Sequence, residues 1–365
     1  MVKRSTIHSI LLTSFLSLLF TFRVIGQIPP GYYDPADGKT EVALQTALHD
    51  IIKGHTVLSY SDLWTAFYTT DDKPNGTVWD MYSDVPDGTP SGNPPYSYTF
   101  GIDQCGNYGG EGQCYNREHS WPKSWFNDTP PMNSDLFHIY PTDGYVNGKR
   151  NNYPYGPVAT ASWTSQNGSK LGTCSWPGYT GTVFEPIDEY KGDFARTYFY
   201  MSTRYYTEDG GWNVTEMTNK SQLKPWALQM MLHWSLIDPV SQKETDRNNA
   251  VYGMQANRNP FIDQPEYASL IWGNPVGADE TAAMDNRLVI YPNPAKDYCS
   301  LTIPAGNTPE DQHPLLFSVT GIQYIPTYAW QGKKLEVDIR TLPVGIYFLI
   351  LRGEQAVYRA KVVKN

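Results

Sequence analysis

The sequence predicts an α+β fold in which a mixed helical domain is followed by a small C-terminal β-sandwich. Residues 42–52 carry a broad apolar stripe at helical spacing. From residue 315 to residue 363, apolar and polar side chains alternate in short segments, which is the period of strands. Residues 276–286 between these patterns are small and polar, as in a linker. The expected parts are a first domain at 27–275, a linker at 276–285 and a sandwich at 286–365.

Residues 1–26 have the composition of a secretory signal peptide. Lys3 and Arg4 precede a run of 13 mostly apolar residues, Ile10 to Phe22, and small residues follow at plausible cleavage positions. The run is shorter than the roughly 20 residues needed to span a bilayer, and no later stretch approaches that length. We therefore expect an exported, soluble protein without stable membrane insertion.

The charge balance argues against bulk electrostatic attraction to nucleic acid. The formal net charge is −9, and loss of Lys3, Arg4 and Arg23 with the signal segment would make it −12. Any contact with phosphates must then come from a local basic patch.

The four cysteines do not have the spacing of a zinc site. Cys105 and Cys114 bracket a glycine-rich loop, and a bridge between them would stiffen that loop. Cys299 alternates with apolar residues, which predicts a buried free thiol on a strand.

Residues 115–150 predict a small ββα unit that contains the candidate site. Residues 117–122 read Arg-Glu-His-Ser-Trp-Pro, and residues 135–141 are expected to form a second strand that Pro141 ends. Thr142 or Asp143 can then cap a short helix that carries Asn147 and Arg150 on one face. A lone Glu-His pair is more often a buried structural feature, so the chemistry depends on the surrounding residues.

Phosphodiester hydrolysis needs an activated water and stabilisation of charge at the phosphate. A neutral imidazole can accept the proton of water, so His119 is the candidate general base. Mg²⁺ prefers oxygen ligands and keeps several waters, so Glu118 and Asn147 are the candidate ligands, with Mn²⁺ or Ca²⁺ as possible substitutes. With one carboxylate available, a single metal ion is favoured. Arg150, Arg196 and Arg258 are the candidate contacts to phosphate oxygens, and the sequence does not choose among them.

Three helices are expected after the ββα unit. Residues 193–205 predict a helix with one apolar face and one face carrying Arg196, Tyr200 and Arg204. Residues 225–234 are apolar nearly all round, which predicts a central core helix. Ser241 and Glu244 predict a capping box at the start of the third helix. On that helix we expect a structural ion pair between Glu244 and Arg247.

The ββα residues resemble the secreted bacterial endonuclease I family. The resemblance extends over roughly residues 40–270 and includes three further segments: Phe184 to Pro186, Lys191 to Arg196 and Asn257 to Asp263. The resemblance implies a ββα-metal active site and a secreted nuclease acting on DNA and possibly on RNA. Phe137 and Gln264 stand where the family often has histidines. Residues 291–294 and 342–347 resemble the C-terminal sorting domain of the type IX secretion system. This resemblance implies the type IX secretion machinery as a partner and a secreted or cell-surface location.

Three functions remain open on the sequence alone. The favoured one is a monomeric, largely sequence-nonspecific secreted endonuclease. The second is a non-catalytic surface protein that binds nucleic acid or glycan through its 27 tyrosines and 11 tryptophans. The third is a metal-dependent phosphodiesterase that acts on small nucleotides.

Overall fold

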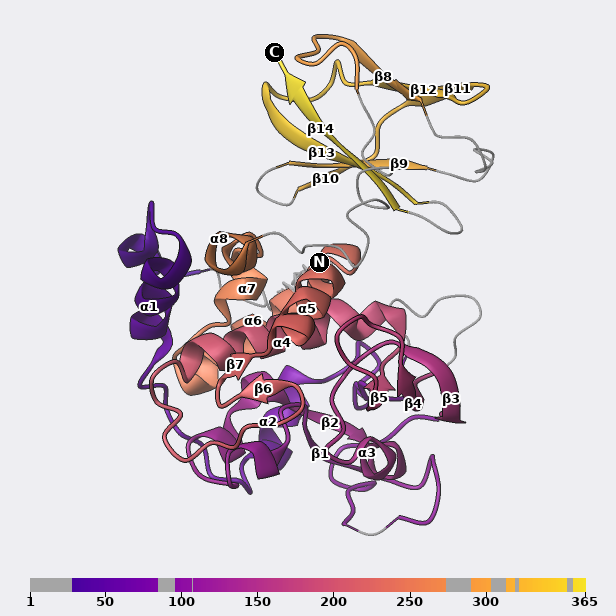
Figure 1. Ribbon diagram of the computed structural model, residues 1–365. Helices are drawn as coiled ribbons and strands as arrows, with labels where there is room; N and C mark the ends of the chain where they lie inside the picture. Colours follow the sequence, from indigo (N-terminus) through magenta and orange to yellow (C-terminus); the bar gives the residue numbers. More distant parts are fainter. Residues whose placement is uncertain are drawn as a thin grey trace, which may run out of the picture.

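The computed structural model of the chain describes residues 28–84, 96–106, 108–273, 290–302, 313–318, 322–352 and 357–365. The predicted signal peptide (1–26) and linker (276–285) lie outside the described residues. Helices and small sheets share the first part, and strands make up the C-terminal part (Figure 1). This mixed content agrees with the predicted α+β class.

The helices and strands of the described residues have the following bounds. The helices are α1 Glu41–Ile52, α2 Leu63–Thr70, α3 Gly144–Arg150, α4 Lys191–Arg204, α5 Pro225–Ile237, α6 Gln242–Gln255, α7 Pro260–Asp263 and α8 Tyr267–Trp272. The first strands are β1 Tyr115–His119, β2 Ile139–Asp143, β3 Val158–Thr164, β4 Lys170–Cys174, β5 Thr182–Glu185, β6 Thr218–Asn219 and β7 Gln222–Leu223. The C-terminal strands are β8 Tyr298–Thr302, β9 Pro314–Ser318, β10 Gln323–Tyr324, β11 Tyr328–Gln331, β12 Lys334–Asp338, β13 Gly345–Arg352 and β14 Val357–Lys364. Among these helices, none is long and apolar enough to cross a bilayer.

The described strands form small antiparallel sheets around two separate hydrophobic clusters. In the first part, β1 pairs with β2, β4 lies between β3 and β5, and β6 pairs with β7. The C-terminal part has two sheets, with strand orders β10-β9-β13-β14 and β11-β12-β8. Side chains from both C-terminal sheets share one cluster, which is separate from the larger cluster of the helical part.

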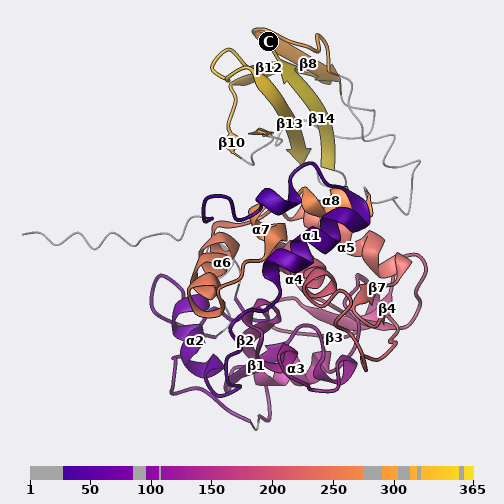
Figure 2. The same ribbon diagram turned by 90° about the vertical axis from the view of Figure 1, so that its left-hand side faces the viewer.

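Helix α4 lies in the middle of the helical part (Figures 1 and 2), and all fourteen of its residues are buried. The expected division into an apolar and an exposed polar face is therefore wrong. Most polar side chains of α4 have partners within the protein: the Tyr200 hydroxyl, for example, donates to the Asp135 carboxylate at 2.8 Å. Among the described residues, the hydroxyls of Ser202 and Thr203 are buried without a hydrogen-bond partner. Burial of the other polar groups is tolerated because they are hydrogen-bonded or ion-paired.

Helix α5 covers α4 and is less central than its apolar sequence predicts. Its buried residues include Met230, Met231 and Trp234, whereas Leu236 is 43% exposed. The apolar residues on the outer side of α5 are only partly covered, because the layer ends there. Sequence periodicity cannot distinguish such a covering helix from a central one.

Helix α6 begins with the predicted capping box. The Ser241 hydroxyl accepts from the Glu244 backbone N–H, and the Glu244 carboxylate accepts from the Ser241 backbone N–H. The expected ion pair between Glu244 and Arg247 is wrong. Arg247 instead pairs with Asp71 at 2.8 Å and donates to the backbone carbonyls of Leu136, in the turn before β2, and of Ile139, at its start. A tertiary partner therefore replaces the local one.

Strand β2 begins at Ile139 and continues through Pro141, so the expected end of the strand at this proline is wrong. Residues 136–138 form a 3₁₀ helix instead of the predicted strand start. The Pro141 carbonyl accepts from the Met81 backbone N–H, so this edge of the residue faces away from β1. The missing N–H of the proline therefore breaks no hydrogen bond of the β1–β2 ladder.

Buried Asp135 anchors the chain just before β2. Its carboxylate accepts from the hydroxyls of Tyr200 and Tyr205, from the Phe137 backbone N–H and from the Gln255 amide. These donors come from α4, the segment after it and α6, so one carboxylate ties β2 to the helical core.

The C-terminal strands confirm the predicted β13–β14 pairing, whose turn lies outside the described residues. In β9 Pro314 and Leu316 are buried, and Leu315 and Phe317 are partly buried. Cys299 is a buried free thiol on β8, as predicted.

Candidate active site

Strands β1 and β2 pair in antiparallel fashion, with Glu118 opposite Tyr140 and His119 opposite Ile139, and helix α3 follows β2 directly. Of the two predicted cap residues, Asp143 performs the capping: its carboxylate accepts from the Val146 backbone N–H at 2.8 Å. Its own backbone N–H donates to buried Asp80. The helix is thus fixed at its first turn directly beside β1.

Two further constraints hold the approach to this unit. Cys105 and Cys114 form a disulfide in the loop that leads into β1. A Cβ atom placed on Gly144 or Gly148 would lie 2.6 Å or 2.5 Å from atoms of the Tyr108 side chain. Glycine at these two positions of α3 therefore allows Tyr108 to lie flat against the helix.

Glu118 is a buried carboxylate, only 3% exposed. Its Oε1 accepts from the Tyr82 hydroxyl at 2.8 Å and lies 3.1 Å from Arg150 Nη1. Burial raises the pKa of Glu118 to about 7, although Arg150 and the Tyr82 hydrogen bond both favour the charged form. A carboxylate that is only partly stabilised in this way would gain from an added cation.

Asn147 lies on the same side of β1 as Glu118. Its Nδ2 donates to the Asn116 Oδ1 at 2.7 Å, and Asn116 and Glu118 are two residues apart on β1, so they share one face. In this orientation the Asn147 amide oxygen is free of the Asn116 contact. The two predicted metal ligands are therefore brought to one face, and Asn116 is a third oxygen-bearing side chain on that face that the sequence reasoning missed.

His119 ends β1 and points to the opposite face. Its ring lies among those of Tyr60, Phe126 and His138, at centroid distances of 5.8, 6.3 and 5.5 Å. Its Nε2 is 3.2 Å from the Asn133 carbonyl oxygen, which can only accept, so Nε2 carries the hydrogen. The lone pair of the neutral ring is therefore on Nδ1.

The surroundings of His119 keep its imidazole neutral. Burial is the main cause that lowers the pKa of His119 well below its ordinary value, and repulsion from His138, Lys123 and Arg117 adds to it. The Asn133 hydrogen bond acts in the other direction but does not offset burial. The ring is therefore unprotonated near neutral pH, the form that can accept a proton.

Arg150 is the one predicted arginine that the structure brings to the Glu118–His119 pair. It is 1% exposed and donates to the backbone carbonyls of His119 and Ser120, at 3.0 and 2.5 Å. Together with its ion pair to Glu118, these bonds fix the end of β1 against α3. Buried Arg150 thus connects helix α3 to the Glu118 side chain and to the backbone at the end of β1.

Arg196 and Arg258 lie elsewhere, and their expected contact with phosphate finds no support in their surroundings. Arg196 is 1% exposed and pairs with Glu244, with Nη2 2.7 Å from Oε2. Arg258 is 1% exposed and pairs with Asp263. Both guanidinium groups are committed to buried carboxylates that the sequence pattern did not reveal.

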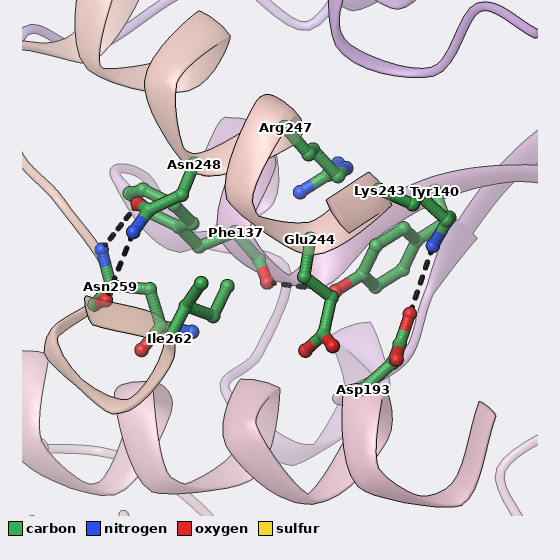
Figure 3. A pocket seen from close by; sticks show the side chains of 9 residues that line it. All are labelled: Phe137, Tyr140, Asp193, Lys243, Glu244, Arg247, Asn248, Asn259 and Ile262. Carbon is green, nitrogen blue, oxygen red and sulfur yellow. Dashed lines mark hydrogen bonds and ion pairs between the residues drawn. The ribbon is translucent and has the colours of Figure 1, made fainter. Parts of the chain in front are cut away.

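The cavity in Figure 3 is lined in part by Glu244, the ion-pair partner of Arg196, and is distinct from the candidate site. It has a volume of about 10 Å³, room for a single water molecule. Its lining includes Asp193, Lys243, Glu244, Arg247 and Asn248, and none of the six predicted site residues. Its charges are paired with one another or with neighbouring groups.

With this geometry in view, comparison with known proteins decides the family. Residues 40–266 match the family model described as Endonuclease I. The chain belongs to the endonuclease I family. It is therefore an endonuclease, and the alternative of a non-catalytic surface protein is set aside. Residues 289–365 match the secretion system C-terminal sorting domain, which supports a secreted or cell-surface location.

Curated relatives of this endonuclease have related names. An extracellular ribonuclease of Bacillus amyloliquefaciens is 38% identical over 247 residues, covering 66% of this chain and 78% of that protein. Endonuclease-1 of Buchnera aphidicola subsp. Acyrthosiphon pisum is 27% identical over 132 residues, 36% of this chain and 45% of the relative. An extracellular deoxyribonuclease of Aeromonas hydrophila is 27% identical over 137 residues, 36% of this chain and 50% of the relative.

Proposed function

We propose that this endonuclease is a secreted, largely sequence-nonspecific hydrolase of DNA and RNA that depends on one divalent metal ion, with Mg²⁺ as the physiological ion. The observation that carries the proposal is the arrangement at the end of β1. A neutral histidine with a free Nδ1 follows a buried carboxylate, and the carboxylate shares its face with two amide side chains. Relatives named ribonuclease and deoxyribonuclease support both substrates.

The donor set suits Mg²⁺. Glu118, Asn147 and Asn116 offer one carboxylate and two amide oxygens, and hard divalent ions prefer oxygen ligands. Among the described residues, no group of three or more His, Cys, Asp and Glu side chains is arranged to hold a metal. An ion at this site would be held by Glu118 and the Asn147 amide, with waters completing its shell. When bound, it would supply charge stabilisation at the phosphate and at the departing oxygen.

The chain's own residues account for the remaining steps. Glu118 and His119 leave β1 on opposite faces, and we propose that they reach one phosphate because the strand ends at His119. His119 Nδ1 would accept the proton of the attacking water, while the Nε2–H bond to the Asn133 carbonyl keeps the ring and its tautomer fixed. The lowered pKa of His119 keeps Nδ1 available near neutral pH. Arg150 would hold Glu118 and the His119 backbone in register, which makes it a positioning residue.

For the C-terminal part, we propose a β-sandwich that is separable from the nuclease domain, with the boundaries 27–275, 276–285 and 286–365. Two sheets that share one hydrophobic cluster support a sandwich. The sorting-domain match supports recognition by type IX secretion machinery. We further propose that the mature protein is a monomer.

Incubation of the purified protein with plasmid DNA and with a long RNA tests the function directly. The series should include EDTA, Mg²⁺, Mn²⁺ and Ca²⁺. The proposal requires cleavage of both polymers at many sequences in Mg²⁺ and loss of cleavage in EDTA. Full activity in EDTA would contradict the metal dependence, and a single recognition site would contradict the lack of sequence specificity.

A further inference from the structure

Arg117 differs from the other arginines of the nuclease part. Among residues 28–84, 96–106 and 108–273, five of the six arginines form ion pairs with carboxylates: Arg150 with Glu118, Arg196 with Glu244, Arg204 with Glu208, Arg247 with Asp71 and Arg258 with Asp263. In the same part of the chain, Arg117 has no carboxylate within ion-pair distance. It is the one guanidinium there whose charge is not neutralised.

The side chain of Arg117 is nevertheless held in place. Its guanidinium carbon lies 3.6 Å from the centroid of the Tyr60 ring and 4.3 Å from that of Trp64. Its Nη1 donates to the Tyr60 carbonyl oxygen at 2.6 Å. Stacking on two rings restricts the rotamers of a long side chain, so little entropy remains to be lost when a ligand binds.

The charge on Arg117 lacks compensation. Burial lowers the pKa of the half-buried guanidinium below its usual value, and only the Tyr60 side chain acts in the other direction. The group stays protonated in spite of this, because arginine does not lose its proton in proteins. Four of its five N–H donors are not used in any hydrogen bond within the described residues. A planar fork of this kind matches the oxygens of a phosphate.

Arg117 lies on the same face of β1 as His119. The two are two residues apart, so their side chains leave the strand about 6.8 Å apart on one side. They also share a neighbour, because the His119 ring lies 5.8 Å from the Tyr60 ring. Lys123 Nζ is 5.6 Å from the same ring, but it pairs with Asp128 at 3.1 Å, so among the described residues Arg117 remains the cation on this side of β1 that has no carboxylate partner.

We propose that Arg117 binds a phosphate of the polynucleotide next to the phosphate that is attacked at His119. This inference rests on the proposed nuclease function. It deepens that function by naming the substrate class: a strand with at least two consecutive phosphates fills both positions, whereas a diester with a single phosphate fills one. Arg117 thus distinguishes polynucleotides from the small nucleotide diesters considered on sequence grounds.

The test compares Arg117→Met and Arg117→Lys with the wild-type protein. Methionine keeps a long unbranched chain between the two rings but has no charge, and lysine keeps the charge without the planar fork. Lys333→Gln is the matched control, because it removes one exposed positive charge at the turn between β11 and β12. KM and kcat for a defined polynucleotide are measured in Mg²⁺ at several salt concentrations, and thermal melting checks that each variant is folded.

For Arg117→Met we expect KM to rise about tenfold at low salt, with a much smaller change in kcat. The slope of log KM against log salt should fall by about 0.7–0.9, the contribution of one phosphate contact. Arg117→Lys should keep the wild-type slope with a smaller rise in KM, and Lys333→Gln should behave as wild type.

Two results would overturn the inference. One is a wild-type KM and salt slope in Arg117→Met while the wild-type protein cleaves polynucleotide. The other is the same loss of slope in Arg117→Lys as in Arg117→Met, which would assign the effect to the ring stack and not to the charge. Failure of the wild-type protein to cleave any polynucleotide in a divalent metal would instead overturn the proposed function.

Discussion

Replacing Tyr82 by phenylalanine isolates the support that the core gives to the proposed metal ligand Glu118. The change removes one hydroxyl, which donates to Glu118 Oε1 at 2.8 Å and lies 2.7 Å from the Tyr155 hydroxyl, and leaves the aromatic ring in place. Both partners are buried, so water does not replace the lost bond. A hydrogen bond to a charged group contributes roughly 1.5–3 kcal/mol. That is equivalent to about one to two powers of ten in binding, the range observed when an outer-shell partner of a metal ligand is removed.

We therefore expect Tyr82→Phe to shift the Mg²⁺ concentration for half-maximal cleavage upward by roughly tenfold to a hundredfold, with much of the activity recovered at saturating metal. Tyr205→Phe is the matched control. Its hydroxyl donates to another buried carboxylate, Asp135, at the same 2.8 Å, but that carboxylate is not a proposed ligand. This control should lose stability and keep the wild-type metal titration. An unchanged titration in Tyr82→Phe, or an equal shift in both variants, would refute the assignment of Glu118.

Three further predictions concern the metal set, the core and the C-terminal part. Glu118→Ala and Asn147→Ala should each move the metal optimum to higher concentration with low residual turnover, and a variant with the wild-type titration would not be a ligand. Burial acts to raise the pKa of Asp135, but the charges of His55 and His138 and several hydrogen bonds together outweigh it and lower the pKa to about 2. The stabilising effect of the Asp135 carboxylate is then fully present above about pH 4 and is lost as the pH falls through 2. The loss amounts to about 2 kcal/mol in the free energy of unfolding. Urea unfolding at pH 5, 3 and 2 should show this dependence in the wild type and much less of it in Asp135→Asn. A chain ending at Asp285 should be folded and fully active but retained in the periplasm of the native host; its appearance outside the cell at normal levels would refute the sorting role, and its unfolding would refute the separability.

Local sequence signals predicted the local structure well. The apolar stripe that predicted the first helix corresponds to α1, and the capping box at Ser241 and the cap at Asp143 are both present. These features depend on residues within a few positions of one another. The sequence also indicated the Glu118–His119 pair and the short helix with Asn147, because these too are patterns of neighbouring residues.

The predictions that failed depend on contacts between distant parts of the chain. The polar side of α4 looked exposed because its partners, such as Glu244 for Arg196, come from 48 residues away. Pro141 looked like the end of a strand because the sequence does not show which edge of β2 faces β1. Tyr82, which holds Glu118, lies 36 residues before it in a loop-rich segment without any recognisable motif. Alternation along β1 could have placed Arg117 beside His119.

The central claim is that His119 accepts the proton of the attacking water, and His119→Ala tests it most directly. The measurement is the single-turnover rate of plasmid cleavage at saturating Mg²⁺, together with thermal melting and metal binding of the same variant. The account predicts a folded protein that still binds metal and cleaves roughly 10²–10⁴ times more slowly than the wild type. A folded variant whose cleavage rate stays within tenfold of the wild type would contradict it.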